Sequence, residues 1–211
     1  MTSTRSLVRR TALTATAVTA ALVLAACGSD NGDNSGSTVK ESPTASAEAT
    51  TAAHNDQDVS FAQGMIPHHQ QAIQMSKMAV TQASSAEVKD LASRIEKAQD
   101  PEIKTMSGWL KAWGEDVPSS MPGMDHGGHS GSSDMPGMMD TEDMDKLMKA
   151  SGKDFDTMFL TMMVEHHEGA VEMATTEKEK GRYGPAKKMA DDIITAQNAE
   201  IEEMNKLLGK N

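Results

Sequence analysis

The fold is decided by one stretch, Met65-Ile66-Pro67-His68-His69-Gln70-Gln71-Ala72-Ile73-Gln74-Met75, which recurs in the second half of the chain. The second copy reads Met163-Val164-Glu165-His166-His167-Glu168-Gly169-Ala170-Val171-Glu172-Met173, so every position is offset by 98 residues. The same offset relates Phe61 to Phe159 and Leu110 to Leu208 without a gap. A fixed offset indicates that one structural unit is used twice.

Helical periodicity surrounds both copies, and no stretch shows sustained strand alternation. Pro67 is expected to kink the first helix or mark its start. Ser84-Ser85-Ala86-Glu87 has the form of a capping box that opens the second helix. The predicted helices cover 58–83, 86–114, 141–150, 154–180 and 184–208.

Two αα-hairpins, each too thin to bury its own apolar stripe, would bury both stripes by facing each other. The sequence therefore predicts an all-α, ferritin-like four-helix bundle with one long Met- and Gly-rich crossover. The predicted bundle domain covers 58–211, with repeat 1 at 58–113, the crossover at 114–153 and repeat 2 at 154–210.

The N-terminal segment predicts export. Three arginines precede an apolar run over 12–26, which is shorter than the ~20 residues that a spanning helix needs. Leu24-Ala25-Ala26-Cys27 resembles the lipobox at which bacterial lipoproteins are cleaved and acylated. We expect a signal peptide at 1–26, lipid on Cys27 and a flexible tether at 27–57. The protein would be held on the outer face of the cytoplasmic membrane.

Charge and cysteine content limit the partners. Without Arg5, Arg9 and Arg10 of the signal, 17 of the 20 basic residues remain against 31 acidic ones, a formal charge of −14. Such a chain disfavours nucleic acid and favours cations. Cys27 is the only cysteine, so any ligand for a soft metal must be a thioether or an imidazole.

The paired histidines and nearby methionines form the predicted bundle site. Neighbouring helical residues point about 100° apart, so the two members of each His-His pair divide between the interior and an adjacent helix. Methionines three residues before the pair or seven after it share its helix face. The predicted ligands are His68, His69, His166, His167, Met65, Met75, Met163 and Met173.

The crossover carries further candidate ligands in an exposed, Gly-rich setting. Met-x-x-Met with nearby His can wrap a soft ion. The alternative is that the later methionines cap the bundle as packing residues. The predicted capture segment comprises Met121, Met124, His126, His129, Met135, Met138 and Met139.

A His/Met set without thiolates favours copper, as Cu(I) through thioethers and Cu(II) through imidazoles. Polar residues also repeat on the second helix of each unit and would hold the free ring nitrogens of the histidines, or else form a solvated face. These residues are Gln99, Glu102, Gln197 and Glu200. Acidification through the usual histidine pKa of ~6.5 is expected to weaken the imidazole component of copper binding first, because protonated histidine cannot act as a ligand.

The doubled His-His motif and the segment Met135-Pro136-Gly137-Met138-Met139 resemble the bacterial domain-of-unknown-function family 305. That family includes CopM-like copper proteins, and the resemblance covers about residues 58–208. It implies a ferritin-like helical domain that is extracytoplasmic and often lipid-anchored, with copper binding in some members.

We therefore expect a membrane-tethered protein that binds copper without catalysis and sequesters it or exchanges it with a partner protein. One alternative is a ferritin-like metal oxidase or peroxide-handling enzyme, although the Glu-x-x-His motifs of di-iron bundles are missing around the pairs. The other is a surface interaction module whose His and Met residues are structural.

Overall fold

A computed structural model describes residues 53–119 and 135–210, all within one unit that spans Ala45–Asn211. The predicted signal peptide, Cys27 and most of the tether lie outside the described residues. So do four crossover candidates, Met121, Met124, His126 and His129.

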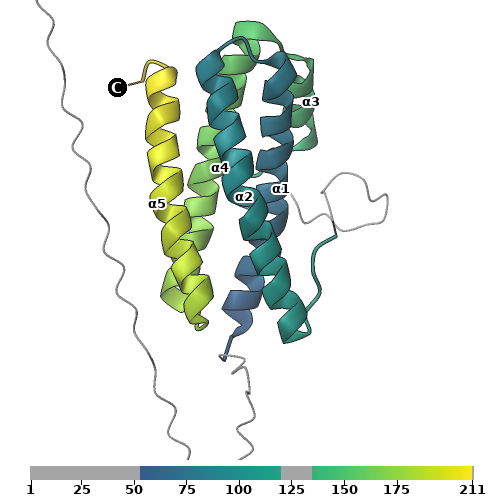
Figure 1. Ribbon diagram of the computed structural model, residues 1–211, viewed down its shortest axis with the longest axis vertical. Coiled ribbons are helices and arrows are strands. Elements are labelled where there is room, and N and C mark those ends of the chain that lie inside the picture. Colours follow the sequence, from purple (N-terminus) through teal and green to yellow (C-terminus); the bar gives the residue numbers. More distant parts are fainter. Residues whose placement is uncertain (1–52, 120–134, 211) are drawn as a thin grey trace, which may run out of the picture. The chain divides into compact units, whose positions relative to one another are not determined.

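The described chain is all-α, as predicted (Figure 1). Helix α1 lies along α2, α4 lies along α5, and α1 also packs against α4. The start of α1 meets the end of α4, where Asn55 donates to the Lys180 carbonyl, so these two helices run antiparallel. The ferritin-like, duplicated-hairpin description stays a prediction. The helices are α1 Asp56–Gln82, α2 Ala86–Trp113, α3 Thr141–Lys149, α4 Gly152–Lys180 and α5 Gly184–Leu207.

Helix α1 begins two residues before the predicted start, because Asn55 caps it through the amides of Gln57 and Asp58. Pro67 lies inside the helix and does not mark its start. Proline there removes one backbone hydrogen bond of the helix, and the second copy has Glu165 at the equivalent position.

The capping-box prediction at the start of α2 is wrong by one residue. Ser85 is the N-cap and accepts from the amide of Val88, so Glu87 does not occupy the third helical position. The preceding Ser84 is instead drawn to Asp156 of α4, which accepts from the Ser84 amide, the Ser84 hydroxyl and the Ser85 amide. Ser84 therefore bonds to the distant Asp156 carboxylate and does not cap α2.

The equivalent contact occurs in the other repeat. Asp58 of α1 accepts from the amides of Arg182 and Tyr183 in the turn between α4 and α5. Each repeat therefore holds the helix–helix turn of the other through one carboxylate. Because a carboxylate that accepts several backbone amides is strongly hydrogen-bonded, these two clamps fix the ends of α1 and α4 against each other.

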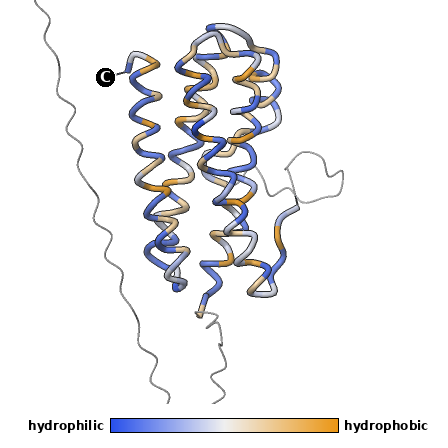
Figure 2. Tube along the Cα trace, viewed as in Figure 1, coloured by the Kyte–Doolittle hydropathy of each residue, from blue (hydrophilic) through white to orange (hydrophobic). Residues whose placement is uncertain are grey.

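Two apolar clusters fill the interior, one at each end of the helices. The first is formed by α1, α2, α3, α4 and Met204 of α5, and the second by α1, α2, α4 and α5. On α1 the clusters are separated at His68 and His69, and on α4 at His166 and His167. Figure 2 shows hydrophilic and hydrophobic positions interspersed along the described helices, as expected of helices that bury one face. None of the described helices is long and apolar enough to cross a membrane.

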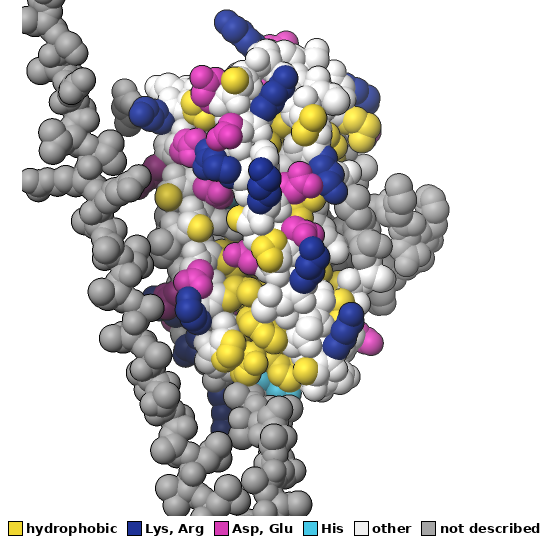
Figure 3. All heavy atoms as spheres, viewed as in Figure 1, with side chains coloured by type: hydrophobic (Ala, Val, Ile, Leu, Met, Phe, Trp, Pro, Cys, Tyr) yellow, Lys and Arg dark blue, Asp and Glu magenta, His cyan; other side chains and the backbone are white. Residues whose placement is uncertain are grey.

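The face seen in Figure 3 carries acidic and basic side chains in alternation, with hydrophobic side chains gathered toward one end of the helices. Pairs such as Arg94–Glu203 and Lys188–Asp192 are exposed, so each contributes little to stability. The aromatic rings of Trp109, Trp113 and Tyr183 contact one another edge-on or stacked.

Candidate metal centre

A polar layer separates the two apolar clusters at mid-length of the four long helices. Each helix contributes two residues to it, and the two repeats supply equivalent positions. The four histidines of the two His-His pairs are fully buried. We call these eight residues the histidine layer, which consists of His68, His69, Gln99, Glu102, His166, His167, Gln197 and Glu200.

The rings of His68 and His166 face each other across the α1–α4 interface. Their centroids are 3.7 Å apart and their planes are inclined by 42°. His68 Nε2 donates to the carbonyl of Pro136 at 3.1 Å, since a carbonyl can only accept. Neither ring nitrogen of His166 has a hydrogen-bond partner, and His68 Nδ1 has none. Three imidazole nitrogens are thus buried together without protein partners.

The other two histidines turn toward the adjacent helix. His69 Nε2 lies 2.7 Å from Glu102 Oε2 of α2, and His167 Nε2 lies 2.7 Å from Glu200 Oε2 of α5. The identical distances show that the duplication is preserved down to single contacts. A carboxylate in this position fixes the ring orientation and leaves Nδ1 as the second nitrogen, which is unpartnered in both rings.

Burial keeps the facing histidines uncharged. It lowers the pKa of His68 to about 3, helped by the nearby His69, while the Pro136 carbonyl opposes the shift. Burial, followed by repulsion from His68, lowers the pKa of His166 well below its usual value. The backbone of His68 opposes this second shift without meeting the geometry of a hydrogen bond. At neutral pH both rings therefore present a lone pair, which a metal ion requires.

The end of the crossover reaches the histidine layer as a tight turn. The Met138 amide donates to the Met135 carbonyl, and Gly137 has φ +73°, so the turn places proline second and a left-handed glycine third. We call Met135–Met139 the strap. It is half-buried against the helices, and its methionines stay predicted metal ligands.

Two thioethers lie near Gly64, one turn of α1 before His68. A Cβ added at Gly64 would lie 3.8 Å from the sulfur of Met135 and 3.8 Å from that of Met173. Gly64 and His68 are four residues apart and share one helix face, so this sulfur pair borders the His68–His166 pair. One thioether of the crossover and one of the second repeat thus lie on the same side of α1.

The remaining predicted bundle ligands lie in the apolar clusters. Met75 and Met163 are fully buried in the first cluster, and Met65 is fully buried in the second. Each follows or precedes the histidine layer by one or two turns of its helix. Gln99 and Gln197 lie buried in the layer with their side-chain oxygens unpartnered.

Sequence reasoning missed Gln71 and Gly169, which hold the strap. The Gln71 amide donates to the Met139 carbonyl and accepts from the Met139 amide, each at 2.8 Å. A Cβ at Gly169 would overlap the Pro136 carbonyl. The available signal was the repeat itself, because Gln71 and Gly169 are equivalent positions occupied by unlike residues.

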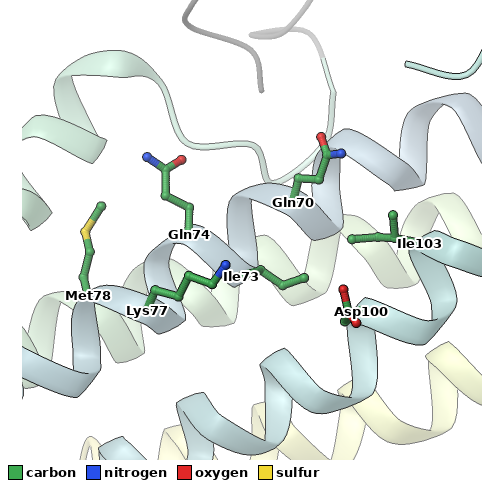
Figure 4. A pocket seen from close by; sticks show the side chains of 7 residues that line it. All are labelled: Gln70, Ile73, Gln74, Lys77, Met78, Asp100 and Ile103. Atoms are coloured by element: carbon green, nitrogen blue, oxygen red, sulfur yellow. The ribbon is translucent and has the colours of Figure 1, made fainter. Parts of the chain in front are cut away.

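The donor set suits a soft ion better than a hard one. No group of three or more His, Cys, Asp or Glu side chains converges within 53–119 and 135–210. The residues that do lie together are the His68–His166 imidazole pair, with unpartnered nitrogens, and two thioethers near Gly64, one helical turn away; imidazole and thioether are ligand types that copper accepts. A groove of about 570 Å³ between α1 and α2, lined in part by Gln74 and Asp100, contains none of the predicted ligands (Figure 4).

Similarities to known proteins agree with this chemistry. The chain is 34% identical to a DUF305 protein from Streptomyces coelicolor described as a candidate secreted protein, over 73% of this chain and 93% of that one, with a TM-score of 0.64. It is 38% identical to CopM in the Cu(II)-bound form, over 72% and 95%, with a TM-score of 0.61. The Cu(I)-bound form of CopM gives 36% identity over 71% and 94%, with a TM-score of 0.58.

CopM also has a silver-bound structure, to which this chain is 34% identical. No curated protein matches the chain in sequence. A family model described as a domain of unknown function, DUF305, matches residues 58–208. The chain belongs to the DUF305 family.

Proposed function

We propose that this protein binds copper outside the cytoplasm, as a lipid-tethered store or carrier that exchanges the metal with a partner protein. Its bundle ligands are His68 and His166 with the thioethers of Met135 and Met173. Copper is the cargo and undergoes no reaction there. His69 and His167, oriented by Glu102 and Glu200, complete the surrounding layer.

One observation carries the proposal, the burial of His166 with both ring nitrogens unpartnered. Leaving a buried polar group without a partner costs about 1–3 kcal/mol, so a chain selected only for stability would place an apolar residue there. The adjacent His68 Nδ1 is unpartnered as well. A cation bound between the rings would satisfy these nitrogens.

The soft donor set supports copper over harder cations, and the copper- and silver-bound forms of CopM support the same class of ion. The extracytoplasmic, tethered location rests on the predicted signal peptide and on Cys27. Replacing Cys27 with Ser should release the protein from the membrane fraction without changing its affinity for copper. Membrane retention of C27S would contradict the lipid anchor.

The main test is titration of the chain from residue 28 with Cu(I) and Cu(II) in competition with chelators. We expect His68→Ala/His166→Ala to lose at least tenfold in Cu(I) affinity, because two ligands disappear. His54→Ala is the matched control, since His54 stacks on Trp113 outside the layer. Unchanged Cu(I) affinity in the double variant would exclude this site.

The crossover contribution is tested by deleting 120–134 only, because the strap that follows belongs to the bundle site. If the shortened chain bound fewer copper ions but held the remaining ones with unchanged affinity, a second, separate capture site would be assigned to that segment. Oxygen consumption during titration with Cu(I) or Fe(II) would favour the enzyme alternative. Full copper stoichiometry after replacement of all four paired histidines would favour the interaction module.

A further inference from the structure

We propose that the strap, Met135–Met139, is a latch over the His68–His166 pair, held shut by Gln71 and Gly169, and that its opening controls exchange of the soft metal ion. This inference rests on the proposed function and adds positioning residues that set how fast the metal leaves. It begins from three separate contacts between the strap and the helices.

The first contact fixes the strap's C-terminal end. Gln71 is buried, and both polar atoms of its amide pair with the backbone of Met139. The next residue, Asp140, caps α3 through the amide of Asp143, so the chain is anchored directly beyond the strap. Two hydrogen bonds from one side chain thus close the latch at that end.

The second contact allows the turn to seat directly on α4. A Cβ at Gly137 would lie 2.5 Å from the carbonyl oxygen of Glu165 and 3.0 Å from the Cα atoms of His166 and Gly169. The backbone of the strap at Gly137 therefore packs directly against the backbone of α4 at Glu165 to Gly169. Any side chain at position 169 would collide with the Pro136 carbonyl and lift the turn away from the histidines.

The third contact links the strap to the metal ligands. Because the Pro136 carbonyl accepts from His68 Nε2, the proton of neutral His68 resides on Nε2 and the lone pair on Nδ1. Closure of the strap therefore selects the ring form whose buried Nδ1 is ready to bind a cation. The closed strap also holds Met135, whose sulfur lies 3.8 Å from a Cβ placed at Gly64, as does the sulfur of Met173.

The repeat explains why the latch acts on one half of the site. A single strap cannot make equal contacts with two equivalent histidines, so it bonds His68 and leaves His166 without a partner. The equivalent positions 71 and 169 differ in the same way. The Gln71 amide is hydrogen-bonded to the strap, whereas Gly169 leaves room for the strap to pack against α4.

The test measures the rate at which bound Ag(I), which does not change oxidation state, passes from the chain to an excess of chromogenic chelator. Gln71→Leu keeps the side-chain volume and removes both hydrogen bonds to Met139. Gly169→Ala displaces the turn. We expect Gln71→Leu to release Ag(I) about tenfold faster than the unsubstituted chain, the effect of losing two buried hydrogen bonds. Gly169→Ala should also release it faster, because the displaced turn no longer seats on α4.

Matched controls lie elsewhere on the helices. Gln74→Leu makes the same change one turn further along α1, where the side chain lines the groove of Figure 4. Gly108→Ala adds a methyl group where nothing lies within 4 Å. Both controls should keep the original release rate. Hydrogen exchange at the Met139 amide reports opening directly and should accelerate in Gln71→Leu even without metal.

The outcomes separate the two proposals. If the unsubstituted chain binds no Ag(I) or Cu(I), the proposed function is overturned and the latch with it. If that chain binds Ag(I) but Gln71→Leu and Gly169→Ala release it at the original rate, only the latch is overturned. Faster release in both, with faster exchange at Met139, supports the latch. If Gly169→Ala does not fold, Gln71→Leu decides alone.

Discussion

His166 shows at the scale of one residue how function and stability oppose each other. Its ring is fully buried, both nitrogens lack partners, and its pKa is held low by burial. Helix geometry predicts that the two members of each His-His pair point in different directions. In the structure His68 and His166 face each other, whereas His69 points to α2 and His167 to α5. Helix geometry could not predict which ring would keep free nitrogens, because that depends on the strap.

Replacing His166 with Leu should stabilise the metal-free protein by roughly 1 kcal/mol, because an unsatisfied polar group gives way to an apolar one of similar size. The same change should lower Cu(I) affinity. Urea unfolding and chelator competition measure the two effects. A variant that loses stability and keeps its affinity would show that His166 is a packing residue.

The low pKa values of His68 and His166 give the metal-free protein a defined response to acid. The unfolded rings gain protons below about pH 6.5, whereas folded His68 stays neutral down to about 3. Stability is therefore complete above pH 6.5 and falls on acidification, by at most about 1.4 kcal/mol per pH unit for each ring.

Unfolding midpoints in urea at pH 7 and pH 5 should show this loss, and His166→Leu should lose less. If the stability of His166→Leu and of the original protein depended on pH identically, the lowered pKa of His166 would be ruled out as a cause of the acid response. The sequence-based expectation also changes, because folded protein should retain copper below pH 6.5. Acid should release the metal through unfolding rather than through protonation of the folded site.

At the scale of elements, the junction of α1 and α4 holds two buried carboxyl groups. Burial, followed by the neighbouring Asp58 carboxylate, raises the pKa of Glu177 to about 8, while Gln57 and Lys187 oppose the shift. Burial alone would raise the pKa of Asp58, but its interaction with Glu177 and the hydrogen bonds from backbone amides bring it below its usual value. At neutral pH Glu177 is thus the protonated member of the pair.

The unfolded Glu177 carboxyl loses its proton near pH 4.5, and the folded one near 8, so the folded state binds more protons in between. Stability should fall as pH rises across that window. Glu177→Gln keeps a donor toward Asp58 and should be more stable than the original by roughly 1–3 kcal/mol at pH 8–9, with little difference near pH 5. Urea unfolding of both proteins between pH 5 and pH 9 measures this difference in stability.

The exposed residue Glu179 provides the control, since Glu179→Gln should leave the pH dependence as it was. Equal stability of Glu177→Gln and the original at pH 9 would contradict the protonated pair. Sequence reasoning could not find this pair, because the first repeat has Ala79 at the position equivalent to Glu177. The element boundaries, by contrast, followed from periodicity and caps to within two residues.

At the scale of the whole molecule, the proposed site joins α1 of one repeat to α4 of the other. A ligand that binds only the folded state stabilises it by about 2.7 kcal/mol at 100 times its Kd. Saturating Ag(I) should therefore raise the unfolding midpoint of the entire described domain in one transition. His68→Ala/His166→Ala should show no such rise, and a rise of equal size there would locate the metal elsewhere.

The strap has a consequence for how this duplicated chain can change over generations. Copying repeat 1 onto repeat 2 would place glutamine at 169, where even a methyl group overlaps the Pro136 carbonyl. Copying in the other direction would replace Gln71 with glycine and erase both bonds to Met139. Exchange of this residue between the halves would thus disturb the strap in either direction, so the contacts of the strap require the two copies to differ at this position.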